Sequence, residues 1–72
     1  MKSRYVIRYH TNHNKSNESE ISVYAHSLKK ALMFAEKEIR AARRPSSIHF
    51  ERYESYDNRG NKSAEGFCIK NV

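Results

Sequence analysis

The chain has 72 residues, with 14 Lys and Arg against 8 Asp and Glu, a formal net charge of +6 and 38% hydrophobic residues. This length supplies apolar material for one small core only, and the Tyr and Phe residues argue against disorder. No apolar run reaches the about 20 residues that a membrane-spanning helix needs, and one cysteine excludes an internal disulfide framework. We therefore expect a single small α+β domain spanning residues 1–72, in the cytoplasm and with no membrane partner.

Two strands open the predicted order. Residues 4–10 alternate between apolar and mostly charged side chains, which is typical of a strand with two different faces. Residues 11–19 are polar without periodicity and predict a loop. Residues 20–25 resume the alternation, with Val23 on one side and Tyr24 on the other. The two strands are expected to form a hairpin.

Residues 27–44 are the one long stretch with helical periodicity. Ser27 is a good N-cap, Pro45 stops the helix, and cations occupy the face opposite the apolar one. A short amphipathic helix must pack against another element, because it is not stable alone in water. The apolar face consists of Leu28, Leu32, Ala35, Ile39 and Ala42.

The third predicted strand covers residues 47–56. Ile48 and Phe50 point to one side, but strict alternation then places Arg52 on that apolar side as well. A β-bulge near Arg52, or an edge position that lets its side chain reach water, would resolve the conflict.

The fourth predicted strand covers residues 63–72, after a turn at residues 57–62 in which Gly60 can take a positive φ. Alternation directs Phe67 and Ile69 into the core and Cys68 away from it.

The order β-β-α-β-β predicts two layers, a four-stranded and mainly antiparallel sheet with one helix packed on one face. One face of the sheet then meets the helix and the other stays open. The sheet residues expected in the core are Ile7, Ile21, Val23, Phe50, Phe67 and Ile69.

The open sheet face is the most informative part of this expectation, because it interleaves cations with aromatic rings. Cations neutralise phosphates and rings stack on bases, so such a face suits single-stranded DNA or RNA. In this hypothesis Arg4, Arg8 and Lys70 contact phosphates, and Tyr24 and Tyr53 stack. The other side chains expected on the open face are Val6, His10, His49, Cys68 and Val72.

The same face has a second interpretation. Val6 and its apolar neighbours favour burial against a protein partner or a second copy, and an exposed edge strand could serve the same purpose. A regulatory or inhibitory protein-binding role, including a homodimer, is therefore the alternative, and a plainly solvated face is the third.

The predicted helix ends in a second cationic group, Arg40, Arg43 and Arg44. Such a group can hold a phosphate backbone without reading bases, and it is also what a solvated helix face looks like. A helix-turn-helix is not expected, because no second helix supports this one.

Catalysis and metal binding have little support in the sequence. Structural zinc sites use four ligands in close-spaced pairs, and only His10 and His13 form such a pair. Cys68 would be a nucleophile only if a histidine met it in space. We expect no metal, no cofactor and no enzyme, but a small binding protein.

Overall fold

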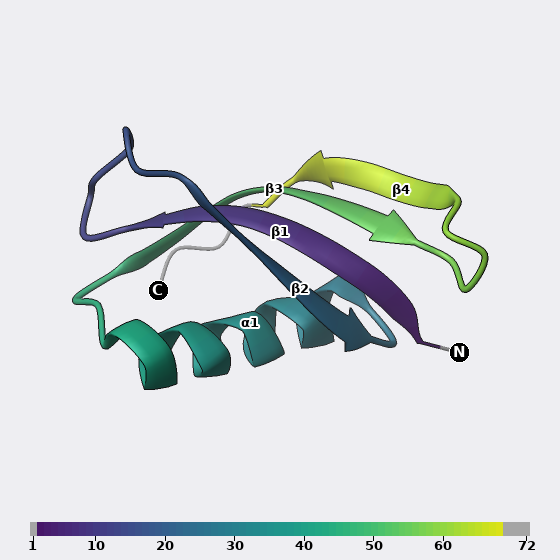
Figure 1. The fold of residues 1–72 in the computed structure, drawn as a ribbon, viewed down its shortest axis with the longest axis horizontal. Coiled ribbons are helices and arrows are strands. Elements are labelled where there is room, and N and C mark those ends of the chain that lie inside the picture. The colour runs from purple at the N-terminus through teal and green to yellow at the C-terminus, as the bar shows by residue number, and fades with distance from the viewer. Residues whose placement is uncertain (1, 69–72) are drawn as a thin grey trace.

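The computed structural model describes residues 2–68 and has the predicted two layers, a sheet with one helix on one face (Figure 1). The strands lie in the order β2-β1-β3-β4, and each neighbouring pair is antiparallel. The predicted fold class is confirmed. The elements are β1 (Ser3–Thr11), β2 (Ser19–Ala25), α1 (Leu28–Arg43), β3 (Ile48–Tyr56) and β4 (Lys62–Phe67).

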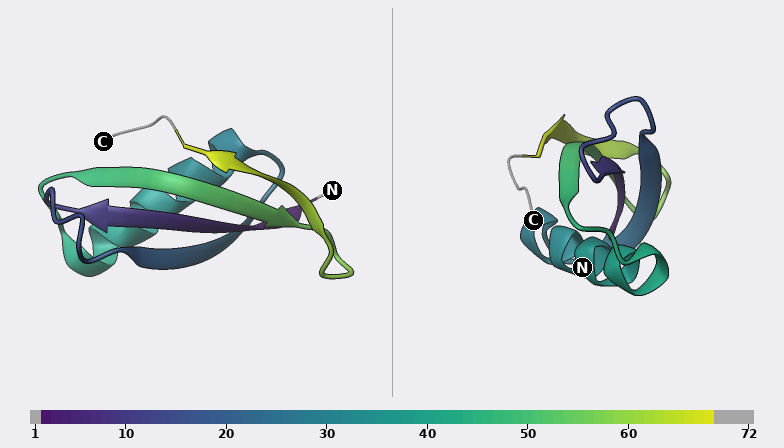
Figure 2. Two further views of the ribbon diagram at one scale, coloured as in Figure 1. Left: turned by 90° about the horizontal axis from the view of Figure 1, so that it is seen from above. Right: turned by 90° about the vertical axis from the view of Figure 1, so that its left-hand side faces the viewer.

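The helix covers only part of the sheet. It packs on β2 and β1, while β4 forms the far edge and is almost wholly exposed. Figure 2 shows the twisted sheet from two further directions, with α1 on one side of it in both. The face opposite α1 has no covering layer among residues 2–68.

The core lies between α1 and the strands it covers. Ile7 and Ile48 are fully buried at its centre, and Tyr5 and Tyr53 pack against its margin. The helical stripe was predicted correctly, except that Ala42 is exposed. The buried helix residues are Ala31, Leu32, Ala35 and Ile39.

Both ends of α1 follow from local chemistry. The Ser27 hydroxyl accepts a hydrogen bond from the Lys30 backbone N–H at 3.2 Å, as an N-cap does. Arg44 ends the helix in the left-handed conformation, with φ 48° and ψ 52°, and its N–H donates to the Arg40 carbonyl. Pro45 follows, as predicted.

A β-bulge in β3 resolves the conflict at Arg52. Arg8 pairs with Arg52 but Tyr9 pairs with Phe50, so Glu51 is an extra residue without a partner in β1. Before the bulge, Phe50 points toward the helix. After the bulge the parity changes, and Arg52 points to the open face.

The bulge also corrects the prediction for Tyr53. We expected this ring on the open face, but Tyr53 pairs with the fully buried Ile7 and lies on the helix side. Its ring centre is 6.4 Å from that of Tyr5. The ring also lies against Gly66, where an added Cβ would be 3.1 Å from Tyr53 Cε1.

Phe67 and Cys68 were predicted with the wrong parity. Gly66 faces the helix side opposite Tyr53, so the next residue, Phe67, turns to the open face and is 77% exposed. Cys68 returns toward the core and packs against its margin. The predictions for Ile69, Lys70 and Val72 concern residues outside the described range.

The predicted turn after β3 is confirmed. The Asp57 carboxylate accepts hydrogen bonds from the backbone N–H groups of Arg59 and Asn61, both at 2.9 Å. Gly60 has φ 85°, the positive value expected of it.

The loop at residues 12–18 is tied to the segment before β3 by Asn12. This residue has φ 55°, and its side-chain oxygen accepts hydrogen bonds from the backbone N–H and the hydroxyl of Ser46, both at 2.7 Å. Its own N–H donates to the Ser47 carbonyl at 3.1 Å. Asn tolerates the left-handed region better than most residues, so both its backbone and its side chain suit this position.

Replacing Asn12 by Ala is expected to lower the free energy of unfolding by about 1–2 kcal/mol, because the Ser46 groups lose their acceptor and the positive φ becomes strained. Asn12→Gly is the matched control, since it removes the acceptor but accepts the φ. Chemical denaturation should rank wild type above N12G and N12G above N12A. Equal stability of all three would contradict the assigned role.

Candidate functional site: the open face of the sheet

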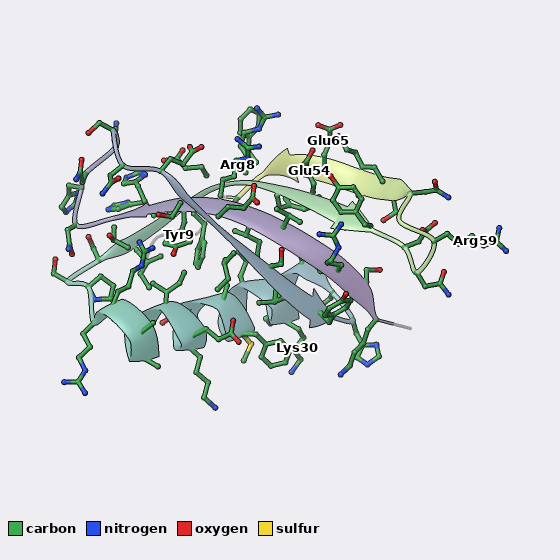
Figure 3. All side chains as sticks on the ribbon, viewed as in Figure 1. Arg8, Tyr9, Lys30, Glu54, Arg59 and Glu65 are labelled. Carbon is green, nitrogen blue, oxygen red and sulfur yellow. The ribbon has the colours of Figure 1, made fainter. Side chains whose placement is uncertain are left out.

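The open face is defined as the sheet surface opposite α1. Figure 3 shows Arg8, Glu54 and Glu65 projecting from this side, while Tyr9 projects toward the helix. Strand register arranges its side chains in three rows across the sheet. Successive rows are two residues apart along each strand, except that Glu65 and Lys62 of β4 are three residues apart because of a register shift. The rows differ in charge, and they are named below for the groups they carry.

The arginine row crosses all four strands and consists of Glu20, Arg8, Arg52 and Phe67. The Arg8 guanidinium lies 3.8 Å from the carboxylates of Glu18 and Glu20. The Arg52 guanidinium lies 3.9 Å from Glu65 and 5.4 Å from the centre of the Phe67 ring. These ion-pair distances exceed hydrogen-bond length, so both guanidiniums are held loosely.

The carboxylate row lies next to it and consists of Ser22, Val6, Glu54 and Glu65. Lys62 reaches this row and lies 2.9 Å from Glu54 and 3.4 Å from Glu65. The hydrogen bond from Lys62 lowers the pKa of Glu54, and the same bond raises the pKa of Lys62. The pair therefore stabilises the fold between the ordinary values of 4.5 and 10.5, and this stabilisation is lost on acidification through the Glu54 pKa or on alkalisation through the Lys62 pKa.

The tyrosine row is the third and consists of Tyr24, Arg4, Tyr56 and Lys62. The Arg4 guanidinium lies 4.7 Å from the centre of the Tyr56 ring, a cation–π contact. Tyr24 is 65% exposed. The row thus offers an exposed ring beside a cation.

A hollow of about 130 Å³ opens on this face and is lined by Val6, Arg8, Arg52, Tyr53 and Glu54. Sites for small-molecule ligands typically enclose about 300–1,000 Å³. A hollow of this size has room for one inserted side chain rather than for a cofactor.

Beyond the arginine row, histidines connect the loop at residues 12–18 to the sheet. His10 is buried, and its Nδ1 lies 2.6 Å from Oε1 of Glu51, the bulge residue. The rings of His10 and His49 stack with centres 4.7 Å apart and planes 11° apart, and the His13 ring lies 4.7 Å from His49 on a tilted plane. Among residues 2–68, no group of three or more His, Cys, Asp or Glu is arranged to hold a metal ion.

The predicted site residues do not all lie on one surface. Arg4, Arg8 and Tyr24 lie on the open face as expected, whereas Tyr53 lies on the helix side and Lys70 is outside the described residues. The predicted cations of the helix, Arg40, Arg43 and Arg44, lie at the C-terminal end of α1.

These helix cations make internal contacts of their own. Arg40 Nε lies 3.1 Å from the Glu36 carboxylate. Arg43 donates a hydrogen bond to the Ser19 hydroxyl at 3.2 Å, and its guanidinium lies 5.8 Å from the centre of the Tyr9 ring. Arg44 is exposed at the C-cap.

Sequence reasoning missed Arg52 and Phe67 as open-face residues. The signal was present for Arg52, because strict alternation would have buried a guanidinium, and a bulge was one of the expected remedies. For Phe67 the signal was weak, since a large apolar residue is normally assigned to the core.

Carboxylates that were not expected on the open face change its charge. Carboxylates there are about as numerous as cations, whereas most of the positive excess of residues 2–68 lies on α1 and its C-cap. The face is therefore a balanced surface with exposed rings, and not the basic surface we expected. The charged groups of the rows and their ion pairs are Arg4, Arg8, Arg52, Lys62, Glu18, Glu20, Glu54 and Glu65.

Comparisons of this chain with protein-family models, curated proteins and solved structures gave no match. In the described part of the chain, α1 is neither long nor apolar enough to span a bilayer.

Cys68 is the one thiol of the chain. Burial raises its pKa to about 11, and the nearby Glu51 carboxylate adds to this effect. The thiol is therefore protonated at neutral pH, and the thiolate is the form that acts as a nucleophile.

Alkylation of Cys68 by iodoacetamide is accordingly expected to be slow at pH 7–8 and to accelerate up to a pH of about 11. Because the folded-state pKa is raised above 9.0, the unfolded chain ionises first, and folding stability should fall as pH rises above that value. Mass spectrometry over a pH series measures the rate, with urea-unfolded protein as the control. Rapid alkylation of the folded chain at pH 7 would contradict this pKa.

Proposed function

We propose that this chain is a small non-enzymatic protein-binding module and that the open face is its binding surface. The observation that carries the proposal is the balance of charges on that face together with exposed apolar and aromatic side chains. Phe67 on the edge strand β4 is 77% exposed, and Tyr24 on the other edge strand, β2, is 65% exposed.

Charge supports a protein rather than a polyanion as the partner of this face. A phosphate backbone gains affinity from cations, but the carboxylates beside Arg8 and Arg52 repel it. A protein surface can present both signs, so Arg8, Arg52 and Glu54 can each find a complement. The hollow of about 130 Å³ beside them suits one side chain of such a partner.

Photo-crosslinking from the native phenylalanines tests this proposal. Phe67 lies on the open face, and Phe34 is exposed on α1, so benzoylphenylalanine can replace either ring with little change in chemistry. We expect a discrete protein adduct in cells from position 67 and none from position 34. Adducts from position 34 alone would contradict the open face as the binding surface.

Nucleic-acid binding is the second candidate function. The excess of positive over negative charge on α1 favours it. Such binding would use Arg40, Arg43 and Arg44 on phosphates, with Arg4, Arg8 and Tyr24 of the open face in a minor role. Cations at a helix end can follow a phosphate backbone without reading sequence.

Arg44→Gly is the sharpest variant for this candidate, because Gly adopts the observed φ of 48° without strain and the loss of charge does not threaten the fold. Electrophoretic shifts with mixed DNA and RNA at two salt concentrations should show weaker binding and a salt slope lower by about 1. Arg59→Gly in the β3–β4 turn is the control, because it removes the same single positive charge at a different place. Equal binding by both variants would dispose of this candidate.

The proposal places the protein in the cytoplasm. A lone, partly buried and protonated Cys68 is compatible with a reducing compartment. Fractionation of cells that express a tagged chain tests this directly.

A further inference from the structure

We propose that the partner of the open face is a second copy of this chain, docked so that the arginine row of each subunit lies on the carboxylate row of the other. This inference rests on the proposed function, because it names the occupant of the same surface. It starts from the order of the rows, with Arg8 and Arg52 in one row and Glu54 and Glu65 in the next.

The face is complementary to itself at Arg52 and Glu54, which lie on β3 in adjacent rows and carry opposite charges. Two sheets that pack face to face keep their strands roughly aligned, and a twofold axis then lies in the plane between them. An axis that runs across the strands, midway between these two rows, exchanges the rows and keeps the strand order. β3 then crosses over β3, and Arg52 faces Glu54 of the partner subunit twice in one interface.

The charges select this axis over the other aligned arrangement. An axis along the strands would leave each row opposite itself and would bring Arg8 over Arg52 of the partner subunit, which is repulsive. Hydrogen-bonding capacity remains for the favoured contact, because Arg52 lies 3.9 Å from its own Glu65, beyond hydrogen-bond length.

Phe67 supplies the apolar area of the surface, because it ends the arginine row and is 77% exposed. Val6 of the carboxylate row is already buried within its own subunit. A sheet of four short strands buries less area than a standard interface, so the expected dimer is weak, with a Kd in the micromolar range or above.

Charge reversal tests the proposed pairing. Arg52→Glu alone sets Glu against Glu54 across the axis, and Glu54→Lys alone sets Lys against Arg52, so each variant should self-associate at least tenfold more weakly than wild type. An equimolar mixture restores opposite charges at both contacts and should form a heterodimer. Sedimentation equilibrium up to millimolar protein measures all three samples.

The matched controls reverse the same charges away from the open face. Arg59→Glu in the β3–β4 turn and Glu38→Lys on α1 are exposed and should self-associate as wild type does. Circular dichroism checks each fold. If a charge-reversed variant unfolds, the neutral variants Arg52→Gln and Glu54→Gln replace it. Each is expected to self-associate severalfold more weakly than wild type.

A wild-type chain that stays monomeric at millimolar concentration, reversed variants that associate as wild type does, or a mixture that fails to associate would each overturn the inference. Crosslinking from position 67 tests the proposed function independently of the dimer. If the chain is monomeric but position 67 crosslinks to a different protein, the second copy is excluded and the binding face stands. If position 67 crosslinks to nothing, both proposals fail.

Discussion

Ile7→Ala is expected to lower the free energy of unfolding by about 3–4 kcal/mol, within the range for truncating a large buried side chain. Ile7 is fully buried on the central strand β1, between β2 and β3. A chain of this length has a total stability of roughly 4–11 kcal/mol, so the variant loses a large part of it. Urea denaturation followed by circular dichroism measures the change.

Ile21→Ala is the matched control for this loss. Ile21 pairs with Ile7 on the neighbouring edge strand and is only partly buried, so its truncation leaves a smaller cavity. The expected loss for I21A is less than half of that for I7A. Equal losses would mean that the core is not centred on β1 as described.

Deletion of Glu51 is expected to lower stability without reversing the parity of β3. Without it, Phe50 and Arg52 become neighbours opposite Tyr9 and Arg8, so alternation keeps Phe50 toward the helix and Arg52 on the open face. The variant loses the carboxylate 2.6 Å from the buried His10 and the carbonyl that accepts the Cys68 N–H at 2.9 Å. We therefore expect it to fold cooperatively, with a lower free energy of unfolding than wild type.

Glu51→Gln distinguishes the effect of the extra residue from the effect of its charged side chain. This variant keeps the residue count of β3 and loses only the charge beside His10 Nδ1, which lies 2.6 Å from the carboxylate. We expect it to fold cooperatively with a moderate loss of stability in thermal denaturation. A deletion variant that unfolds at the same temperature as wild type would show that the contacts of Glu51 do not stabilise the fold, and one that cannot fold would contradict the register described for β1 and β3.

The order and type of the elements follow from local patterns. The helical stripe of Leu32, Ala35 and Ile39, the cap at Ser27 and the stop at Pro45 are all short-range signals. The alternation of β1 and β2 is likewise local. These features predicted the fold class and most of the core.

Register could not be predicted in the same way. The bulge at Glu51 depends on the pairing of β3 with β1, and no local signal fixes which residue stays without a partner. The extra residue reverses the parity of the rest of β3, which explains the error at Tyr53. Phe67 and Cys68 follow in β4 and just after it, and the pairing of β4 with β3 has a second register shift, between Ser55 and Tyr56.

The wrong parity after the bulge also changed which residues were expected on the open face. The prediction was correct for β1 and β2, which come before the bulge along the chain and carry Arg4, Arg8 and Tyr24. With these residues alone, the predicted face was basic. Of the four carboxylates that balance its charge, Glu54 and Glu65 come from β3 and β4, beyond the bulge, whereas Glu18 and Glu20 lie before it. A face assembled from four strands has a composition that no single strand reveals.

The central claim is that the open face binds protein, and a second copy in particular. A dilution series of amide ¹H–¹⁵N spectra tests it most directly, because it locates the surface that changes as concentration rises. We expect concentration-dependent shifts at Arg8, Arg52 and Glu54 on the open face and none at the exposed residues of α1. Shifts confined to α1, or spectra that do not change up to millimolar protein, would contradict the account.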